Sequence, residues 1–290
     1  MGELRRELGL GYATLFGVGL ILGAGIYVLI GRAAGIVGDA VWLSVAFSGL
    51  IAVSTAFSYA ELSSIFTTAA STYTYVAEAF PGTRLLAFMA AWMLFFGGVA
   101  GAATAGLGFS SYFTRLFGLG ESWIVPVTVA LLLALSVLNW WGIKESAALS
   151  AVFTVIEASG LLLVSLLGLL FPLRSPGYFS FNPSTNPVLA VLVGAAVFYF
   201  AYTGFEYQPA LSGKNPESMP KSIVLAVGVT TLTHLLVSVS VVRLMIWEEL
   251  VSSRAPIADT ALRVWRAQLP HSEHIFFLSA RSSHAVLFSS

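Results

Sequence analysis

Seven long apolar runs follow one another along the chain, separated by short polar joins. A helix needs about 20 apolar residues to cross the hydrocarbon core of a bilayer, and each run reaches or approaches that length. They cover residues 10–36, 40–66, 84–114, 123–139, 147–171, 188–211 and 222–247. A membrane barrel would instead show alternating strands of about 10 residues. The sequence therefore predicts an all-α polytopic membrane protein.

Composition supports this class of protein and argues against several others. Hydrophobic residues make up 57% of the chain and charged residues only 10%, where a soluble domain carries about 25%. The net charge is zero, so neither nucleic acid nor an acidic partner is expected. The chain has no cysteine, which excludes disulfides and thiolate metal sites. It shows no serine–histidine–acid arrangement and no phosphate loop, so we expect neither an enzyme nor a cofactor.

The chain divides into a membrane part and a C-terminal part of different character. Residues 1–247 are predicted to form one transmembrane domain, and residues 248–266 an amphipathic segment lying on the membrane. We expect residues 267–290 to be a non-native or disordered tail. His271 and His274 in that tail have a spacing seen in metal ligands, but we predict no metal site there.

Basic residues give the orientation. One side would carry Arg5, Arg6, Arg84, Lys144, Lys214 and Lys221, and the other Arg32, Arg115, Arg174, Arg243 and Arg254. Cytoplasmic joins carry an excess of Lys and Arg, and the bias here is slight. It predicts a multi-pass protein of the cell membrane with its N-terminus in the cytoplasm.

The first run contains a weak point, the Gly-Ala-Gly of residues 23–25 within FGVGLILGAGIYVLIG. Glycine in a helix interior costs about 1 kcal/mol relative to alanine, so the helix should unwind here most easily. Unwinding exposes backbone N–H and C=O groups, which protein, water or a ligand must satisfy inside a bilayer. Close helix packing is the alternative reading, because Gly19 and Gly23 have the spacing that lets two helices approach.

A second interruption stands in the sixth run, FYFAYTGFEYQPALSGKNPE, at Thr203 and Gly204. The two interrupted runs are five helices apart, as expected for an inverted five-helix repeat with a binding site between the repeats. Free N–H groups of a half-helix starting near Ile26 suit a carboxylate. Carbonyls freed around residues 201–203 suit an ammonium group. Together the two breaks predict a site for the backbone of an amino acid.

The same segments resemble those of the amino acid–polyamine–organocation superfamily of transporters, especially prokaryotic permeases related to cationic amino acid transporters. The matching pieces are GVGLILGAGIYVLIG, YAELSSIF, STYTYVAEAFPG, NWWGIKESA, FYFAYTGFEY and KNPESMPKSI. The resemblance implies a LeuT-like fold of two inverted five-helix repeats with discontinuous first and sixth helices. It also implies secondary active transport of an amino acid by alternating access, either proton-coupled or as exchange.

The resemblance further implies which residues bind substrate. The break in the first run would hold the substrate carboxylate through backbone N–H groups, and the break in the sixth run would bind its amino group. Nearby aromatic rings would line or gate the pocket. The predicted substrate-binding residues are Ile21, Gly23, Ala24, Gly25, Ile26, Phe200, Ala201, Tyr202, Thr203, Gly204 and Phe205. This chain departs from the family in residues 211–213, which lack the acidic residues often found before the Asn-Pro pair.

Glu157 is the candidate for proton coupling. It lies in the middle of the fifth run, and Ser146, Ser150 and Thr154 precede it at helical spacing, which predicts one polar stripe facing the bundle interior. A carboxylate at that depth should be protonated, paired or hydrated. The alternative is a structural carboxyl group that is hydrogen-bonded to a neighbouring helix. Several proton-coupled members of the family that the chain resembles carry a lysine at about this place.

Three other polar residues lie near or within the runs. For Glu61 we favour a structural hydrogen bond, and for His234 a hydrogen-bonded interior position. Glu206 could pair with a basic residue in a gate or serve structure alone.

The number of runs bears on activity. Transporters of this type normally need about ten helices, and seven runs are present. We therefore expect a truncated or frame-shifted product that transports poorly or not at all. A further alternative is a non-transporting membrane scaffold in which the glycines only pack helices.

Overall fold

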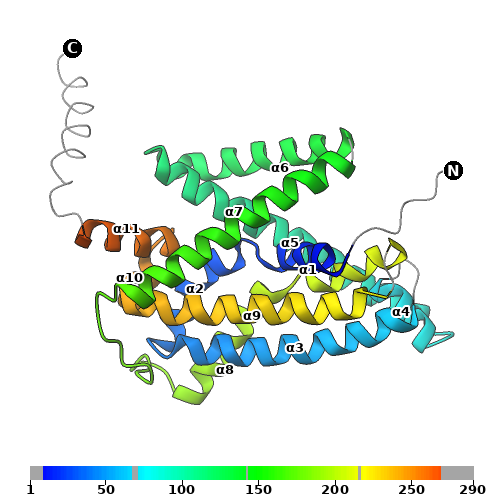
Figure 1. Ribbon diagram of the computed structural model, residues 1–290, viewed down its shortest axis with the longest axis horizontal. Coiled ribbons are helices and arrows are strands. Elements are labelled where there is room, and N and C mark those ends of the chain that lie inside the picture. Colours follow the sequence, from blue (N-terminus) through cyan, green and yellow to red (C-terminus); the bar gives the residue numbers. More distant parts are fainter. Residues whose placement is uncertain (1–8, 67–70, 142, 215–216, 269–290) are drawn as a thin grey trace, which may run out of the picture.

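The computed structural model describes residues 9–66, 71–141, 143–214 and 217–268, and Figure 1 shows their arrangement. These residues fold into helices joined by short connections. In chain order they are α1 (Leu10–Ile21), α2 (Ala24–Val37), α3 (Val41–Ile65), α4 (Thr72–Ala79), α5 (Arg84–Leu116), the 3₁₀ helix η1 (Glu121–Trp123), α6 (Ile124–Trp141), α7 (Ile143–Leu170), α8 (Pro187–Tyr199), the 3₁₀ helices η2 (Phe200–Tyr202) and η3 (Phe205–Lys214), α9 (Met219–Leu244), α10 (Trp247–Ser252) and α11 (Pro256–Gln268).

Six segments of the described residues are long and apolar enough to cross a membrane, judged by length and composition. They are α3, α5, residues 121–140, residues 152–170, residues 187–210 and α9. A seventh is the pair of α1 and α2, which is bent by 48° at its junction. The predicted all-α polytopic membrane protein is therefore confirmed. The inverted repeat and the LeuT-like arrangement stay predictions, and the predicted runs miss the short helix α4.

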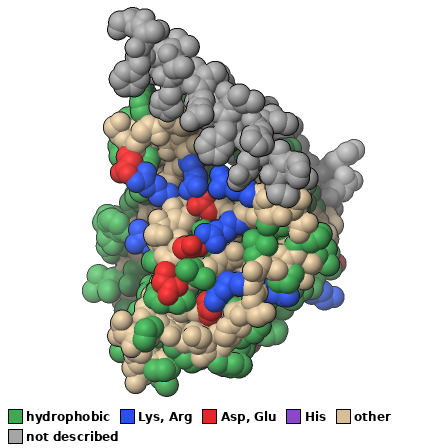
Figure 2. Space-filling view, turned by 90° about the vertical axis from the view of Figure 1, so that its left-hand side faces the viewer, with side chains coloured by type: hydrophobic (Ala, Val, Ile, Leu, Met, Phe, Trp, Pro, Cys, Tyr) green, Lys and Arg blue, Asp and Glu red, His purple; other side chains and the backbone are tan. Residues whose placement is uncertain are grey.

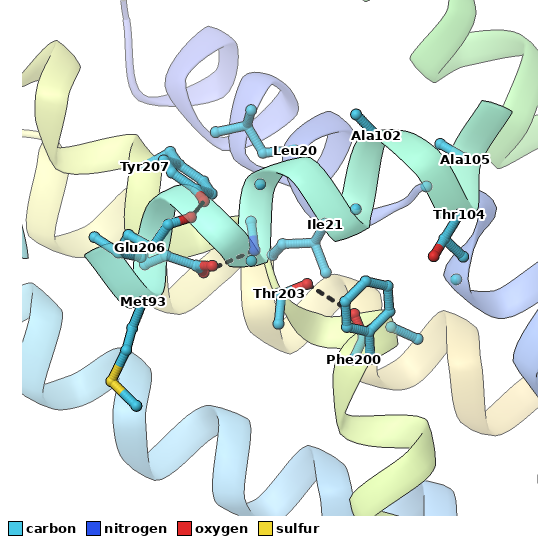
Figure 3. A pocket seen from close by; sticks show the side chains of 18 of the residues that line it. Leu20, Ile21, Met93, Ala102, Thr104, Ala105, Phe200, Thr203, Glu206 and Tyr207 are labelled. Atoms are coloured by element: carbon cyan, nitrogen blue, oxygen red, sulfur yellow. Dashed lines mark hydrogen bonds between the residues drawn. The ribbon is translucent and has the colours of Figure 1, made fainter. Parts of the chain in front are cut away.

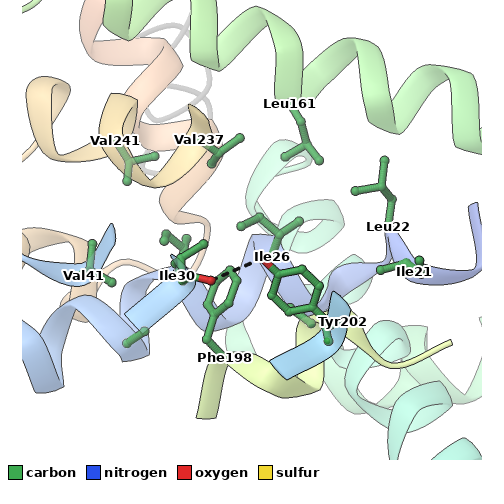
Figure 4. Packing of buried hydrophobic residues seen from close by; sticks show 14 of the residues in the cluster. Ile21, Leu22, Ile26, Ile30, Val41, Leu161, Phe198, Tyr202, Val237 and Val241 are labelled. Atoms are coloured by element: carbon green, nitrogen blue, oxygen red, sulfur yellow. Dashed lines mark hydrogen bonds between the residues drawn. The ribbon is translucent and has the colours of Figure 1, made fainter. Parts of the chain in front are cut away.

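The core lies between α2, α3, α8 and α9. α9 runs beside α3 and also packs against α1 and α7, while α8 packs against α2 and α3 (Figure 1). Ile26, Phe198, Tyr202 and Val237 are among the buried side chains that meet there (Figure 4). In the most apolar stretch of α9, 50% of the residues are buried, against 6% in α5. The apolar side chains of α5 are therefore largely left on the outside, where lipid can cover them.

Local sequence explains where α8 starts and stops. The Asn186 side chain accepts hydrogen bonds from the N–H groups of Val188 at 3.0 Å and Leu189 at 3.2 Å, and thereby caps the helix. Pro187 occupies the first turn, where its missing N–H is not needed. At the other end the helix tightens into η2, and the helical backbone stops before Gly204. The φ of Gly204 is +131°, a backbone conformation that residues with a side chain rarely adopt.

One end of the bundle is rich in ion pairs. Figure 2 shows acidic and basic side chains gathered on the end that carries α10 and α11. The pairs in this region join Arg115 to Asp259, Arg254 to Glu121 and Arg263 to Glu249. They link α11 to α5, η1 to the connection before α11, and α11 to α10. Short connections at this end are thus tied to the spanning helices.

Arg174 ties the connection between α7 and α8 to the same bundle. Its two terminal nitrogens donate to the carboxylate of Asp39 at 2.9 and 2.7 Å, and one also reaches the carbonyl of Val242 at 3.0 Å. The hydrogen bond to Asp39 raises the pKa of Arg174, so the pair stays charged. A cation beside the last turn of α9 also suits the negative end of the helix dipole.

The segment predicted to be amphipathic folds as α10 and α11, with a break at residues 253–255. α11 buries Pro256, Ile257, Thr260 and Val264, and it packs against α2, α7 and α9. Residues 269–290, which include both histidines of the predicted tail, lie outside the described residues.

Candidate binding site

The first break lies at Leu22 and Gly23. α1 ends at Ile21, Leu22 has a ψ of 103°, Gly23 is extended with φ −141° and ψ −172°, and α2 begins at Ala24. The break is thus centred slightly before the predicted residues 23–25. The N-cap residue of α2 is Gly23, which has no side chain to cap the helix. N–H groups in the first turn of a helix lack intrahelical partners and carry partial positive charge, so this end suits an anion.

The second break runs from Phe200 to Gly204 and includes the predicted interruption at Thr203 and Gly204. η2 is followed by Thr203 in an extended conformation, with φ −64° and ψ 147°. The Thr203 hydroxyl donates to the carbonyl of Phe200 at 2.8 Å, and the N–H of Gly204 donates to the carboxylate of Glu206 at 2.7 Å (Figure 3). Two backbone groups of this break, the carbonyl of Phe200 and the N–H of Gly204, are therefore satisfied by the nearby side chains of Thr203 and Glu206.

The two breaks touch each other through their backbones. A Cβ atom on Gly25 would lie 2.8 Å from the Cα of Ala201, and one on Gly204 would lie 2.6 Å from the carbonyl carbon of Leu20. Real Cβ atoms essentially never come that close to backbone. Glycine at these two positions therefore allows the two broken spans to cross in contact.

A cavity of about 690 Å³ lies beside this crossing (Figure 3). It lies between the first break, the second break and the middle of α5. Seven predicted site residues line it: Ile21, Gly23, Gly25, Phe200, Ala201, Thr203 and Gly204. Glu206, which the sequence analysis left between gating and structure, lines it as well.

Three predicted site residues lie in the core. Ile26 and Tyr202 are fully buried, and Phe205 is nearly so. The Tyr202 hydroxyl donates to the carbonyl of Val45 at 3.3 Å, and the ring of Phe205 meets Tyr59 edge-on at 5.6 Å. These residues pack in the core next to the breaks and are not among the cavity-lining residues that the structure describes.

The α5 wall is the part of the cavity that sequence reasoning missed. It consists of Ala90, Met93, Leu94, Gly97, Gly98, Gly101, Ala102, Thr104 and Ala105. The run GGVAGAATAG at residues 97–106 was the available signal, because small residues let another element approach a helix. Tyr207 adds to this wall and donates its hydroxyl to the carbonyl of Leu94 at 2.9 Å.

The described lining has a simple charge pattern. It contains one carboxylate, that of Glu206, and no Lys or Arg side chain. Within this lining an anion must be met by N–H groups such as those at the start of α2, whereas a cation can be met by Glu206 or by carbonyls.

Glu157 lies on α7, outside the described cavity lining, and is partly buried. Its backbone carbonyl accepts a hydrogen bond from the hydroxyl of Tyr27 at 3.1 Å. Thr154, one turn earlier, is buried and packs against α1. This part of the predicted stripe therefore faces α1 and α2, while the side chains of Ser146 and Ser150 lie outside the described residues.

His234 is fully buried on α9, as its predicted interior position requires. Its ring packs edge-on against Phe198 at 5.5 Å and Tyr202 at 4.8 Å. Neither ring nitrogen has a hydrogen-bond partner among the described residues, so the predicted hydrogen bond is not observed. Glu61 is exposed near the end of α3.

The known proteins that this chain resembles in sequence include several transporters. The chain is 30% identical over 269 residues to the methylthioribose transporter of Bacillus subtilis, a match covering 86% of this chain and 57% of that protein. It is 29% identical over 257 residues to the branched-chain amino acid permease BcaP of the same bacterium, covering 81% and 54%. It is 31% identical over 284 residues to the chloroplastic cationic amino acid transporter 9 of Arabidopsis thaliana, covering 89% and 48%.

The chain thus spans about half the length of the curated relatives that it matches. The family model for amino acid permeases matches residues 8–265, which include both breaks and the cavity between them. The relatives named above are transporters and not enzymes. The chain belongs to the amino acid permease family.

Proposed function

We propose that this chain forms the substrate-binding part of a secondary active transporter that moves an amino acid across a membrane by alternating access. The observation that carries the proposal is the cavity of about 690 Å³ where two interrupted spans cross. Its location supports binding, because interrupted spans leave backbone polar groups at membrane depth for a substrate to satisfy.

The chemistry of the lining favours a zwitterion. The uncapped start of α2, at Ala24 and Gly25, offers N–H groups and a positive helix end to a carboxylate. Carbonyls of the second break and the carboxylate of Glu206 offer acceptors to an ammonium group. The small side chains of α5 leave room for the rest of the substrate.

Cysteine protection tests substrate binding directly. Because the chain has no cysteine, Ala24→Cys introduces one reactive group at the first break. We expect a water-soluble maleimide to label it, and leucine, arginine or methylthioribose to slow that labelling if the molecule binds. Ser184→Cys, on the exposed connection before α8, is the control and should react equally with and without these molecules. Equal labelling of Ala24→Cys throughout would favour a non-transporting scaffold.

Proton coupling through Glu157 is part of the proposal. Glu157 lies where α7 contacts α2, since its backbone carbonyl accepts a hydrogen bond from the Tyr27 hydroxyl, and a carboxyl group inside a membrane favours its neutral form. Glu157→Gln removes its titration at nearly constant shape. We expect this change to flatten the pH dependence of substrate protection at Ala24→Cys. An unchanged profile would remove Glu157 from the coupling scheme and leave exchange as the alternative.

The proposed location is the cell membrane, with the N-terminus in the cytoplasm. This orientation places the end with the Arg174–Asp39 pair outside. A membrane-impermeant maleimide added to intact cells should then label Ser184→Cys. Labelling only after the membrane is opened would reverse the orientation.

A further inference from the structure

Gln208 is a polar side chain of η3 that is fully buried. Its amide nitrogen donates to the backbone carbonyl of Ala13 in α1 at 3.0 Å and to the hydroxyl of Ser222 in α9 at 2.9 Å. The Ser222 hydroxyl in turn donates to the carbonyl of Met219 at 2.8 Å. A carbonyl can only accept, so the nitrogen and not the oxygen of the amide must face Ala13. One side chain therefore joins three elements.

Gly17 makes room for this amide. A Cβ atom at that position would lie 2.7 Å from the Cδ of Gln208 and 2.8 Å from the Cβ of Ala226. α1 thus lies directly on Gln208 and α9. The amide oxygen of Gln208, however, has no hydrogen-bond partner among the described residues. A buried acceptor without a partner raises the energy of this arrangement and offsets part of the stabilisation from the two hydrogen bonds of the amide nitrogen.

An extended junction separates α1 from α2. α1 ends at Ile21 and is joined to α2 only through the extended residues Leu22 and Gly23. Its last turn, with Leu20 and Ile21, forms part of the cavity wall. A change in the position of α1 therefore changes the access to the cavity.

We propose that Gln208 is a positioning residue that latches α1 onto η3 and α9, and that breaking its hydrogen bonds opens the cavity on the α1 side. The inference goes beyond the proposed function and does not depend on which substrate binds. The latch is closed in this structure, with the amide between the two helices.

The test follows the exposure of α1 in the full chain embedded in membranes. Val18 is buried on α1, at 6% exposure, so Val18→Cys should react slowly with a water-soluble maleimide. Gln208→Met keeps the length of the side chain and removes both hydrogen bonds. We expect it to raise the labelling rate of Val18→Cys about tenfold, because two buried hydrogen bonds no longer hold α1. Gly17→Ala should act in the same direction by displacing the amide.

A cysteine at Val41, which is fully buried at the start of α3, distinguishes local opening from general loosening. It should stay protected in the Gln208→Met chain. An unchanged labelling rate at Val18→Cys would overturn the latch, and so would an equal rise at both positions. The experiment needs no substrate, so its outcome is separate from that of the protection experiment at Ala24→Cys.

Discussion

The two breaks that cross at the cavity satisfy their backbone polar groups by different means. At the second break, the hydroxyl of Thr203 and the carboxylate of Glu206 hydrogen-bond to the backbone of the break itself. At the first break, two extended residues separate α1 from α2, and α2 starts without a side-chain cap among the described residues. The second break is therefore held in part by nearby side chains, whereas the N-cap residue of α2, Gly23, provides no side-chain cap. The start of α2 is thus the end that suits an anion.

This difference assigns different tasks to the two breaks. A ligand that supplies a carboxylate gains most at the first break, where N–H groups are available. The second break is held by its own hydrogen bonds. It packs against the first break where Gly25 approaches the backbone of Ala201. We therefore expect changes at the second break to affect stability and changes at the first to affect binding, and three substitutions test this division.

Gly204→Ala should have the largest effect. The residue has a φ of +131°, and a Cβ there would collide with the carbonyl of Leu20. Backbone strain of about 1–3 kcal/mol and overpacking of similar size should together lower the free energy of unfolding by about 3 kcal/mol or more. Denaturant titration of the protein in detergent measures this loss.

Gly97→Ala is the matched control for that substitution. Gly97 also lines the cavity, but a Cβ there would meet no atom within 4 Å. We expect Gly97→Ala to leave stability unchanged or to raise it by up to about 1 kcal/mol, because alanine favours the helix. Equal losses in the two variants would show that the geometry of the second break is not the cause.

Gly25→Ala should have a smaller effect on stability and a clear one on binding. The added methyl group meets the Cα of Ala201 at 2.8 Å and its Cβ at 3.0 Å. Overpacking of about 1–3 kcal/mol is partly offset by the helix preference of alanine, which leaves a net loss of about 1–2 kcal/mol. Substrate protection at Ala24→Cys should weaken, because the start of α2 is pushed away from the second break.

Combining Gly25→Ala with Ala201→Gly shows which atom of Ala201, its Cα or its Cβ, causes the loss of stability. The double substitution removes the Cβ of Ala201 but keeps its Cα, so we expect only part of the lost stability to return. Full recovery would mean that the methyl groups alone collide. No recovery would contradict a direct contact between the two breaks.

The sequence predicted the parts of this site that depend on local signals. Long apolar runs gave the spanning helices, and the glycines at residues 23–25 and 204 marked both breaks, because glycine weakens a helix wherever it lies. The sequence also assigned Arg115, Arg174 and Arg254 to the same side, and each of the three forms an ion pair in the structure.

The parts that could not be predicted depend on tertiary packing. α5 is apolar around most of its circumference, so its sequence does not say which face meets the cavity. Tyr202 lies in the second break and Phe205 follows it directly, yet both side chains are buried in the core, whereas Phe200 and Thr203 line the cavity. The latch at Gln208 joins residues about 195 positions apart, a separation that no local pattern encodes.

Glu206→Ala tests whether the second break supports itself, and its expected loss of stability is no larger than that of Gly25→Ala. The substitution removes the carboxylate that accepts the N–H of Gly204 at 2.7 Å. A lost hydrogen bond to a charged acceptor should lower the free energy of unfolding by about 1–2 kcal/mol. Glu206→Gln is the control, because its amide oxygen can still accept this N–H, and it should retain most of the stability.

If Glu206→Gln loses as much stability as Glu206→Ala, the charge and not the hydrogen bond holds the break. If neither variant loses stability, the second break is no more self-supporting than the first, and the division of tasks between the two breaks fails.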